Sequence, residues 1–184
     1  MATIHQDAGA ALDTGQLAGL LREAGGAEHD FLPADRAADY LSRLDQGAVR
    51  CIWAVQDGVL GAALLYSRFG PLLPIAGAFL RLEGIYVEEV MVTSAWRRAG
   101  WSRTLLNRLR EIVGTGPDIY IDCDAANAAS VAMMGSAGYV HLADYDDPDR
   151  VEPPSRHRTT SLFRHPGRPA RLVQAAARGG MTVG

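Results

Sequence analysis

Apolar and polar positions recur with two different periods along the 184-residue chain, and these periods predict both helices and strands. Stretches 14–25 and 33–47 have a helical period, each with apolar residues on one side. Stretches 49–55 and 59–66 read as strands, and Asp57-Gly58 between them is a strong signal for a two-residue hairpin turn. The first third of the chain is therefore expected to form two helices and a β-hairpin.

The second half continues with alternating strands and helices. Its strands are rich in β-branched and aromatic residues, and its first helix has leucines spaced to share one side. Strand, helix, strand, helix and two final strands are expected at 85–93, 101–113, 118–124, 127–137, 139–145 and 158–163.

The segment 69–80 does not fit either period. It reads FGPLLPIAGAFL, which is apolar but interrupted by glycine and proline, an unusual composition for a solvent-exposed loop. It can line a pocket, pack in the core or lie in a subunit interface. Together with an expected edge strand near 158–163, it would suit a homodimer.

This order of elements predicts an α/β (α+β) fold, with one mixed central β-sheet flanked by helices in a single domain over residues 14–165. Residues 1–13 are expected to be weakly ordered, and residues 166–184 to form a tail with a short helix at most. Strands 85–93 and 118–124 should be parallel neighbours, and ligands of open sheets bind between the carboxyl ends of such strands.

Composition narrows the class of protein. Hydrophobic residues make up 48% and charged residues 21%, as is usual for a globular domain, and no apolar run reaches the ~18 residues of a membrane span. A net charge of −3 argues against nucleic-acid binding. All 18 basic residues are arginine, which excludes lysine Schiff-base chemistry.

The remaining composition indicates no metal and no disulfide. The five histidines lack the spacing of zinc ligands. Cys51 and Cys123 have no paired spacing, and the N-terminus lacks the basic start and apolar run of a secretion signal. We therefore expect reduced thiols in a cytoplasmic protein.

Candidate chemistry lies in the turn after strand 85–93. The turn contains Arg97, Arg98 and Gly100, and it leads into the predicted helix 101–113. Glycine permits close backbone approach, and a helix N-terminus carries a partial positive charge that suits a phosphate. The turn therefore predicts a phosphate site, and the alternative is a solvated helix start.

These residues resemble the GCN5-related N-acetyltransferase (GNAT) family, whose signature is Q/R-x-x-G-x-G/A after a strand. Here the strand is Val90-Met91-Val92 and the signature is Arg97-Arg98-Ala99-Gly100-Trp101-Ser102. A second signature begins at Asn127, has a small residue at Ser130 and ends at Gly138-Tyr139. The resemblance implies a GNAT-like domain and an acyl-CoA, usually acetyl-CoA, as co-substrate.

The resemblance also implies a role for each part of the site. The amides of residues 98–103, with Arg97, Arg98 and Arg103, would bind the pyrophosphate of coenzyme A. Strand residues 90–92 would pair with the pantetheine arm, and one amide would polarise the thioester carbonyl. Asn127 would contact the arm, although a helix N-cap would explain this residue without any ligand.

The strand 86–92 is most similar to that of the diamine and polyamine acetyltransferases, and it carries Glu88 and Glu89. An alkyl amine has a pKa near ~10 and arrives protonated, so a carboxylate that takes its proton is useful. Alternation puts only one of the two in the cleft unless the strand bulges. Glu88, on the side of Val90 and Val92, is the preferred base and Glu89 the reserve. The alternative is that the carboxylate in the cleft binds a cationic amine without acting as base.

One position departs from the family. Its general acid, a tyrosine seven residues after the asparagine, is Met134 here, and methionine cannot donate a proton. The thiolate can leave unaided or through water, since its pKa is near ~8.5. Alternatively another donor serves, and the candidates are Tyr139, Tyr120, Cys123 and Ser136.

Two hypotheses follow from this departure. The first is an acyl-CoA-dependent N-acyltransferase for a small amine, which the retained glutamates favour. The second is a GNAT-fold protein that binds coenzyme A or another ligand without ordinary acetyl transfer. The acceptor stays open among a polyamine, an aminoglycoside, a protein N-terminus and a biosynthetic intermediate.

Overall fold

The computed structural model describes residues 1–6, 12–27, 30–31, 34–147 and 159–167. The helices in this part are α1 (Thr14–Gly25), α2 (Ala34–Asp45), the 3-10 helix η1 (Ser94–Trp96), α3 (Trp101–Val113) and α4 (Ala128–Ser136). The strands are β1 (Thr3–Gln6), β2 (Gly26–Ala27), β3 (Asp30–Phe31), β4 (Arg50–Gln56), β5 (Val59–Ile75), β6 (Ala78–Val92), β7 (Ile119–Asp124), β8 (Val140–Asp146) and β9 (Thr159–His165).

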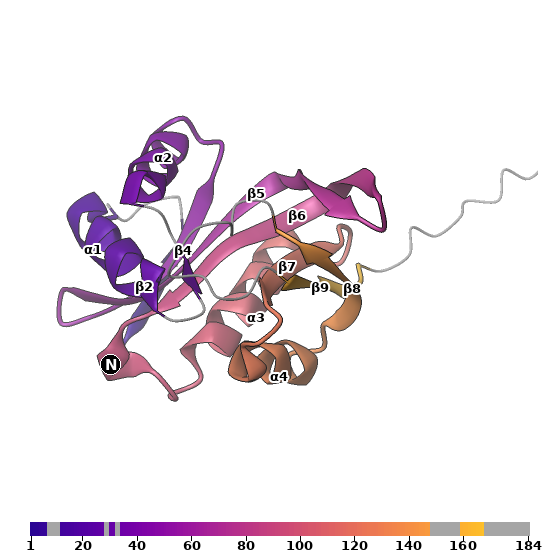
Figure 1. Cartoon of the computed structure of the whole chain (residues 1–184). Helices are drawn as coiled ribbons and strands as arrows, with labels where there is room; N and C mark the ends of the chain where they lie inside the picture. The colour runs from indigo at the N-terminus through magenta and orange to yellow at the C-terminus, as the bar shows by residue number, and fades with distance from the viewer. Residues whose placement is uncertain (7–11, 28–29, 32–33, 148–158, 168–184) are drawn as a thin grey trace, which may run out of the picture.

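The chain forms the expected α/β fold around one mixed sheet. In the described part, seven strands lie in the order β1-β4-β5-β6-β7-β9-β8, and β2 and β3 form a separate two-stranded pair. Figure 1 shows the neighbouring strands β5, β6 and β7 of the large sheet. Among the described strand pairs of the large sheet, β6 with β7 is parallel and the others are antiparallel. The predicted parallel neighbours are confirmed.

Helices cover both faces of the sheet, and each face has its own hydrophobic cluster. On one face α1 and α2 pack through Leu17, Leu21 and Tyr40 against β4, β5 and β6. On the other face α3 and α4 pack through residues such as Leu105 and Met134. Burial of leucine-rich helix stripes on both faces of a sheet provides the main apolar stabilisation of such a fold.

The apolar segment 69–80 is the distal part of a long hairpin. Strands β5 and β6 pair as far as Ile75 and Ala78, and the turn between them has positive φ at Ala76 (53°) and Gly77 (79°). Positive φ at both central positions matches the twist of a tight hairpin. Among the side chains of this arm that the structure describes, the exposed large apolar ones are Leu72 (51%), Phe79 (70%) and Leu80 (48%).

Two expectations differ from the observed fold. Residues 1–13, expected to be weakly ordered, contain β1, which pairs with β4 between Thr3 and Val55. The edge strand expected near 158–163 is not an edge, because β9 lies between β7 and β8. Pairing partners that are distant in sequence decide both features, and local periodicity does not report them. The C-terminal tail from residue 168 lies outside the described residues.

Candidate functional site

The site begins where β6 and β7 separate. Their register pairs only residues 85–87 with residues 119–121, and the last pair is Val87 with Ile121. Both strands continue beyond it, to Val92 and Asp124. Backbone groups of β6 that face this opening are available to a ligand rather than to a neighbouring strand.

A cavity of about 670 Å³ lies at this separation, a volume typical of ligand sites. It includes all the cofactor-site residues predicted from sequence except Ala99. Its lining is Ala24, Val90, Met91, Val92, Trp96, Arg97, Arg98, Gly100, Trp101, Ser102, Arg103, Asn127, Ala129, Ser130 and Met133. The strand end, the basic turn and the start of α4 therefore meet around one space.

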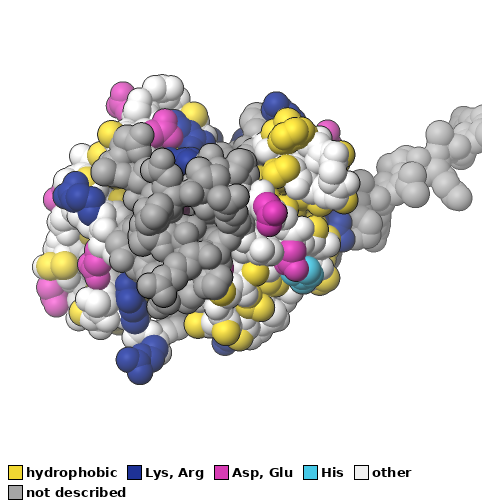
Figure 2. Space-filling model, in the orientation of Figure 1, with side chains coloured by type: hydrophobic (Ala, Val, Ile, Leu, Met, Phe, Trp, Pro, Cys, Tyr) yellow, Lys and Arg dark blue, Asp and Glu magenta, His cyan; other side chains and the backbone are white. Residues whose placement is uncertain are grey.

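The basic turn is shaped by two residues in the left-handed region. Arg98 has φ 63° and Gly100 has φ 80°, and Gly100 is the N-cap of α3. The first amides of a helix have no acceptor within the helix, so those after Gly100 can bind an anion. Three arginines and no acidic residue belong to the described lining, and Figure 2 shows basic side chains over this loop. The geometry fits a phosphate-bearing ligand.

An indole pair forms one wall of the cavity. The rings of Trp96 and Trp101 lie with centroids 4.8 Å apart. Trp96 lies against Gly61 of β5, where an added Cβ would stand 2.2 Å from the indole ring. Sequence reasoning missed the pair of Trp96 and Gly61, although a glycine inside a strand signals close approach of another group.

Asn127 lies at the start of α4 and has a structural role of its own. Its side-chain oxygen accepts a hydrogen bond from the Ser130 N–H at 3.1 Å, which is an N-cap. Asn127 and Ser130 both line the cavity. Arg103 donates to the Ser136 hydroxyl at 2.6 Å and so links α3 to α4 beside the same space.

A β-bulge corrects the prediction for the two glutamates. Leu65 pairs with Glu89 and Tyr66 pairs with Val87, so Glu88 is the extra residue of β6. The bulge puts Val87 and Val90 on the same face although they are three residues apart, in the cluster of α3 and α4.

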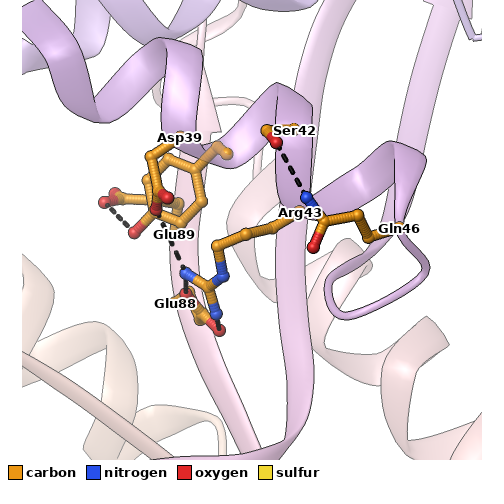
Figure 3. A network of polar contacts seen from close by, with 7 residues as sticks. Asp39, Ser42, Arg43, Gln46, Glu88 and Glu89 are labelled. Carbon is orange, nitrogen blue, oxygen red and sulfur yellow. Dashed lines mark hydrogen bonds and ion pairs between the residues drawn. The ribbon is translucent and has the colours of Figure 1, made fainter.

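Glu88 therefore does not lie on the face of Val90 and Val92, as expected, but contacts α2 on the opposite face. Arg43 of α2 donates to both Glu88 oxygens, at 2.6 and 2.7 Å (Figure 3). The Tyr40 hydroxyl donates to Glu89 at 3.1 Å. Neither glutamate belongs to the described lining of the cavity. Burial, and next the negative charge of Glu89, raise the pKa of Tyr40.

Sequence reasoning missed Arg43 and Tyr40, although both lie one turn apart on the predicted helix 33–47. Arg43 is also 3.7 Å from Asp39, and its guanidinium lies over the Tyr40 ring at 5.7 Å. Only Tyr40 carried a signal, as an inward-facing aromatic residue. A long arginine side chain gives no sequence signal for which strand residue it reaches.

Met134, at the position of the family's general acid, is buried within the α3 and α4 cluster at 3% exposure. None of the four alternative donors belongs to the described lining of the cavity. Tyr139 has a buried hydroxyl for which the described residues give no partner, and burial raises its pKa. The Tyr120 hydroxyl donates to Asp118, and the Ser136 hydroxyl donates to the Met133 carbonyl. Cys123 packs at the edge of the core.

The described residues contain no group of three or more His, Cys, Asp or Glu side chains able to hold a metal ion. Among the helices of the described part, none has the length and apolar character needed to cross a membrane.

Comparison with known proteins identifies the family of this arrangement. The model of the acetyltransferase (GNAT) family matches residues 16–139. No curated protein sequence gives a match. Solved structures share the fold at low sequence identity, so they support the fold alone.

Three of these structures span nearly the whole chain. The ribosomal-protein-S18-alanine N-acetyltransferase from Escherichia coli has a TM-score of 0.68 at 16% identity, over 94% of this chain and 98% of its own. Aminoglycoside 6'-acetyltransferase type Ii has a TM-score of 0.66 at 16% identity, over 91% and 99%. The structure of yncA from Salmonella typhimurium, with its cofactor acetyl-CoA, has a TM-score of 0.62 at 17% identity, over 95% and 98%.

Proposed function

The chain belongs to the acetyltransferase (GNAT) family, and we propose that it transfers an acyl group, in the first place acetyl, from coenzyme A to a small amine. The observation that carries this proposal is the cavity at the separation of β6 and β7, because it joins the end of β6, beyond its pairing with β7, to a basic helix N-terminus. Acetyl-CoA supplies the activated thioester, and the amine attacks its carbonyl directly.

The donor half of the proposed site would bind coenzyme A. The amides after Gly100, with Arg97 and Arg98, would hold the pyrophosphate, because the helix terminus and the guanidinium groups both favour an anion. Amides at Val90–Val92 would orient the pantetheine arm and polarise the carbonyl. Arg103 supports this half by its link to α4.

The acceptor half would lie on the α2 side of the separation, next to Glu88 and Glu89. Both carboxylates point toward this side, since they contact Arg43 and Tyr40. A negative wall suits an amine that arrives as an ammonium ion. The acceptor would lose its proton to a carboxylate or to water before attack.

The resemblance of strand 86–92 to the diamine and polyamine acetyltransferases has no support from the comparisons. The Arg43 guanidinium next to Glu88 argues against it, because a second cation there would repel a polyamine. An amine with fewer charges therefore fits the described side chains better.

The second candidate function is binding of coenzyme A by this fold without ordinary acetyl transfer. The buried Met134 favours it, because the N–H and O–H groups of the described lining belong to serine, asparagine, arginine, tryptophan and the backbone, none of which is an ordinary acid for a leaving thiolate. The enzyme stays ahead because a thiolate needs little help as a leaving group.

Thiol release from acetyl-CoA separates the two candidates. The panel would contain an alanyl peptide, an aminoglycoside and spermidine, with binding of coenzyme A followed through the fluorescence of Trp96 and Trp101. Amine-dependent thiol release supports the enzyme. Binding without release from any amine supports the second candidate, and no binding of coenzyme A would refute both.

Two further predictions remain proposals. A homodimer through the 69–80 arm is supported by the exposure of Leu72, Phe79 and Leu80, and analytical ultracentrifugation of Phe79→Ser beside the wild type would test it. A cytoplasmic location is supported by the sequence, in which Cys51 and Cys123 lack the paired spacing of a disulfide framework.

A further inference from the structure

The Arg43–Glu88 ion pair ties α2 to the bulge of β6 at the edge of the proposed acceptor site. We propose that Arg43 is a positioning residue, which fixes the Glu88 carboxylate so that it binds the acceptor amine and does not take its proton. This inference rests on the proposed function and adds to it a residue outside the strand signatures.

The bulge explains why Glu88 needs an external partner. A residue in a regular strand has its side-chain direction set by the pleat, whereas an extra residue in a bulge does not. Glu88 has no partner in the β5 register, which passes from Glu89 to Val87. Its direction is therefore set by what its carboxylate contacts.

The contact with Arg43 is the strongest kind of ion pair that the chain can form. Each terminal nitrogen of Arg43 donates to one oxygen of Glu88, which is the parallel, two-bond geometry that a guanidinium gives and an ammonium cannot. The Glu88 side chain is only 8% exposed and that of Arg43 is 30% exposed. A carboxylate this buried is costly without a partner, so loss of Arg43 would release it from this direction.

Arg43 is itself held in place from α2. Its guanidinium lies over the ring of Tyr40 and near Asp39, four residues back on the helix. The pairing with Glu88 raises the pKa of Arg43, which keeps the guanidinium charged. The charged and titratable groups around the pair, from both packed elements, include Arg36, Asp39, Tyr40, Tyr86 and Glu89.

The pairing determines which role suits Glu88. A carboxylate offers about four acceptor positions, and the guanidinium uses two of them. The other positions can still receive an N–H of an ammonium, directly or through one water. Because both Glu88 oxygens already accept from Arg43 and are fixed in place, binding of the amine is the role that the geometry favours.

Steady-state kinetics of Arg43→Gln, Glu88→Gln and the double variant test the inference, with the best amine of the panel and acetyl-CoA. We expect each single variant to raise the acceptor KM about tenfold, to leave the acetyl-CoA KM unchanged and to keep the wild-type pH profile of kcat. The double variant should be no worse than either single one, because both remove the same unit. Arg43→Lys should restore part of the loss, since it keeps the charge without the fork.

A matched control is Arg108→Gln, which removes an ion pair with Glu111 and a hydrogen bond to Gln6, neither of them in the described cavity lining. This variant should leave all constants unchanged. A purely structural role of Arg43 would alter both KM values and kcat together. An unchanged acceptor KM in Arg43→Gln, or a flattened pH profile in Glu88→Gln, would overturn the inference. A wild-type protein without amine-dependent thiol release would instead overturn the proposed function itself.

Discussion

Tyr86 of β6 donates its hydroxyl hydrogen to the Asp122 carboxylate of β7 at 2.6 Å, at the level where these two strands separate. Tyr145 of β8 donates to the same oxygen at 2.5 Å. Asp122 is the first β7 residue beyond the last bridged pair, as Glu88 is on β6. On each strand, the first side chain beyond the last bridged pair is therefore a carboxylate. Each carboxylate accepts hydrogen bonds from side chains of other elements.

The Tyr86–Asp122 contact predicts a measurable loss of stability. Burial, and next the charge of Asp122, raise the pKa of Tyr86, so its hydroxyl stays protonated and able to donate. Tyr86→Phe should lower the free energy of unfolding in urea by about 1.5–3 kcal/mol, the usual contribution of a hydrogen bond to a charged group. Tyr120→Phe is the control, because its bond to Asp118 is longer, at 3.3 Å. Equal losses in both variants would contradict the assignment.

Gly100 and Gly58 give a matched pair of substitutions. Both have positive φ, 80° and 78°, and an added Cβ at either meets nothing within 4 Å. Replacement by alanine should therefore cost each variant about 1 kcal/mol of unfolding free energy, from the left-handed backbone alone.

The two glycine variants should differ in ligand binding. Gly100 lines the cavity, whereas Gly58 lies in the turn between β4 and β5. Gly100→Ala should weaken coenzyme A binding about tenfold or more by occupying the space of the phosphate, and Gly58→Ala should leave it unchanged. Calorimetric titration measures both, and equal affinities would remove Gly100 from the proposed phosphate site.

Much of the fold could be predicted from the sequence because the elements have strong local signals. The helical stripe of 101–113, the alternation of 118–124 and the cap at Asn127 depend only on residues near one another in the chain. That the strand end and the basic turn line one cavity was predictable for the same reason, since the two are consecutive in the chain.

The surroundings of Glu88 and Glu89 could not be predicted because they depend on contacts across the fold. A single extra residue at Glu88 reverses the face on which every later side chain of β6 lies, and periodicity does not locate it. Arg43 reaches Glu88 from a helix 45 residues earlier in the chain. The alternation along the strand therefore predicted the right strand for the glutamates but the wrong face for Glu88.

At position 98, glycine is expected to give a more stable protein than alanine, which is the opposite of the usual order. Its φ of 63° is a left-handed conformation that a side chain disfavours and glycine does not. Arg98→Gly should therefore be more stable than Arg98→Ala by about 0.5–1 kcal/mol in urea unfolding.

The same two variants of Arg98 should lose coenzyme A affinity equally. Both remove one guanidinium from the cavity lining, and the loss should shrink as salt is added, because screening weakens the attraction of an exposed charge. Titrations at low and high ionic strength measure this. A stability order of alanine above glycine would refute the left-handed backbone, and an unchanged affinity would place Arg98 outside the phosphate contacts.

Gly61 and Trp96 are expected to be coupled in energy. Because an alanine Cβ at position 61 would lie 2.2 Å from the Trp96 ring, Gly61→Ala must displace the indole or the strand. The variant should lose about 1–3 kcal/mol of unfolding free energy from overpacking, and its tryptophan emission should change. In a Trp96→Ala background the added Cβ meets no indole ring, so the same substitution should lower the free energy of unfolding far less. A double-mutant cycle measures the difference, and additive effects would show that Trp96 does not lie against Gly61.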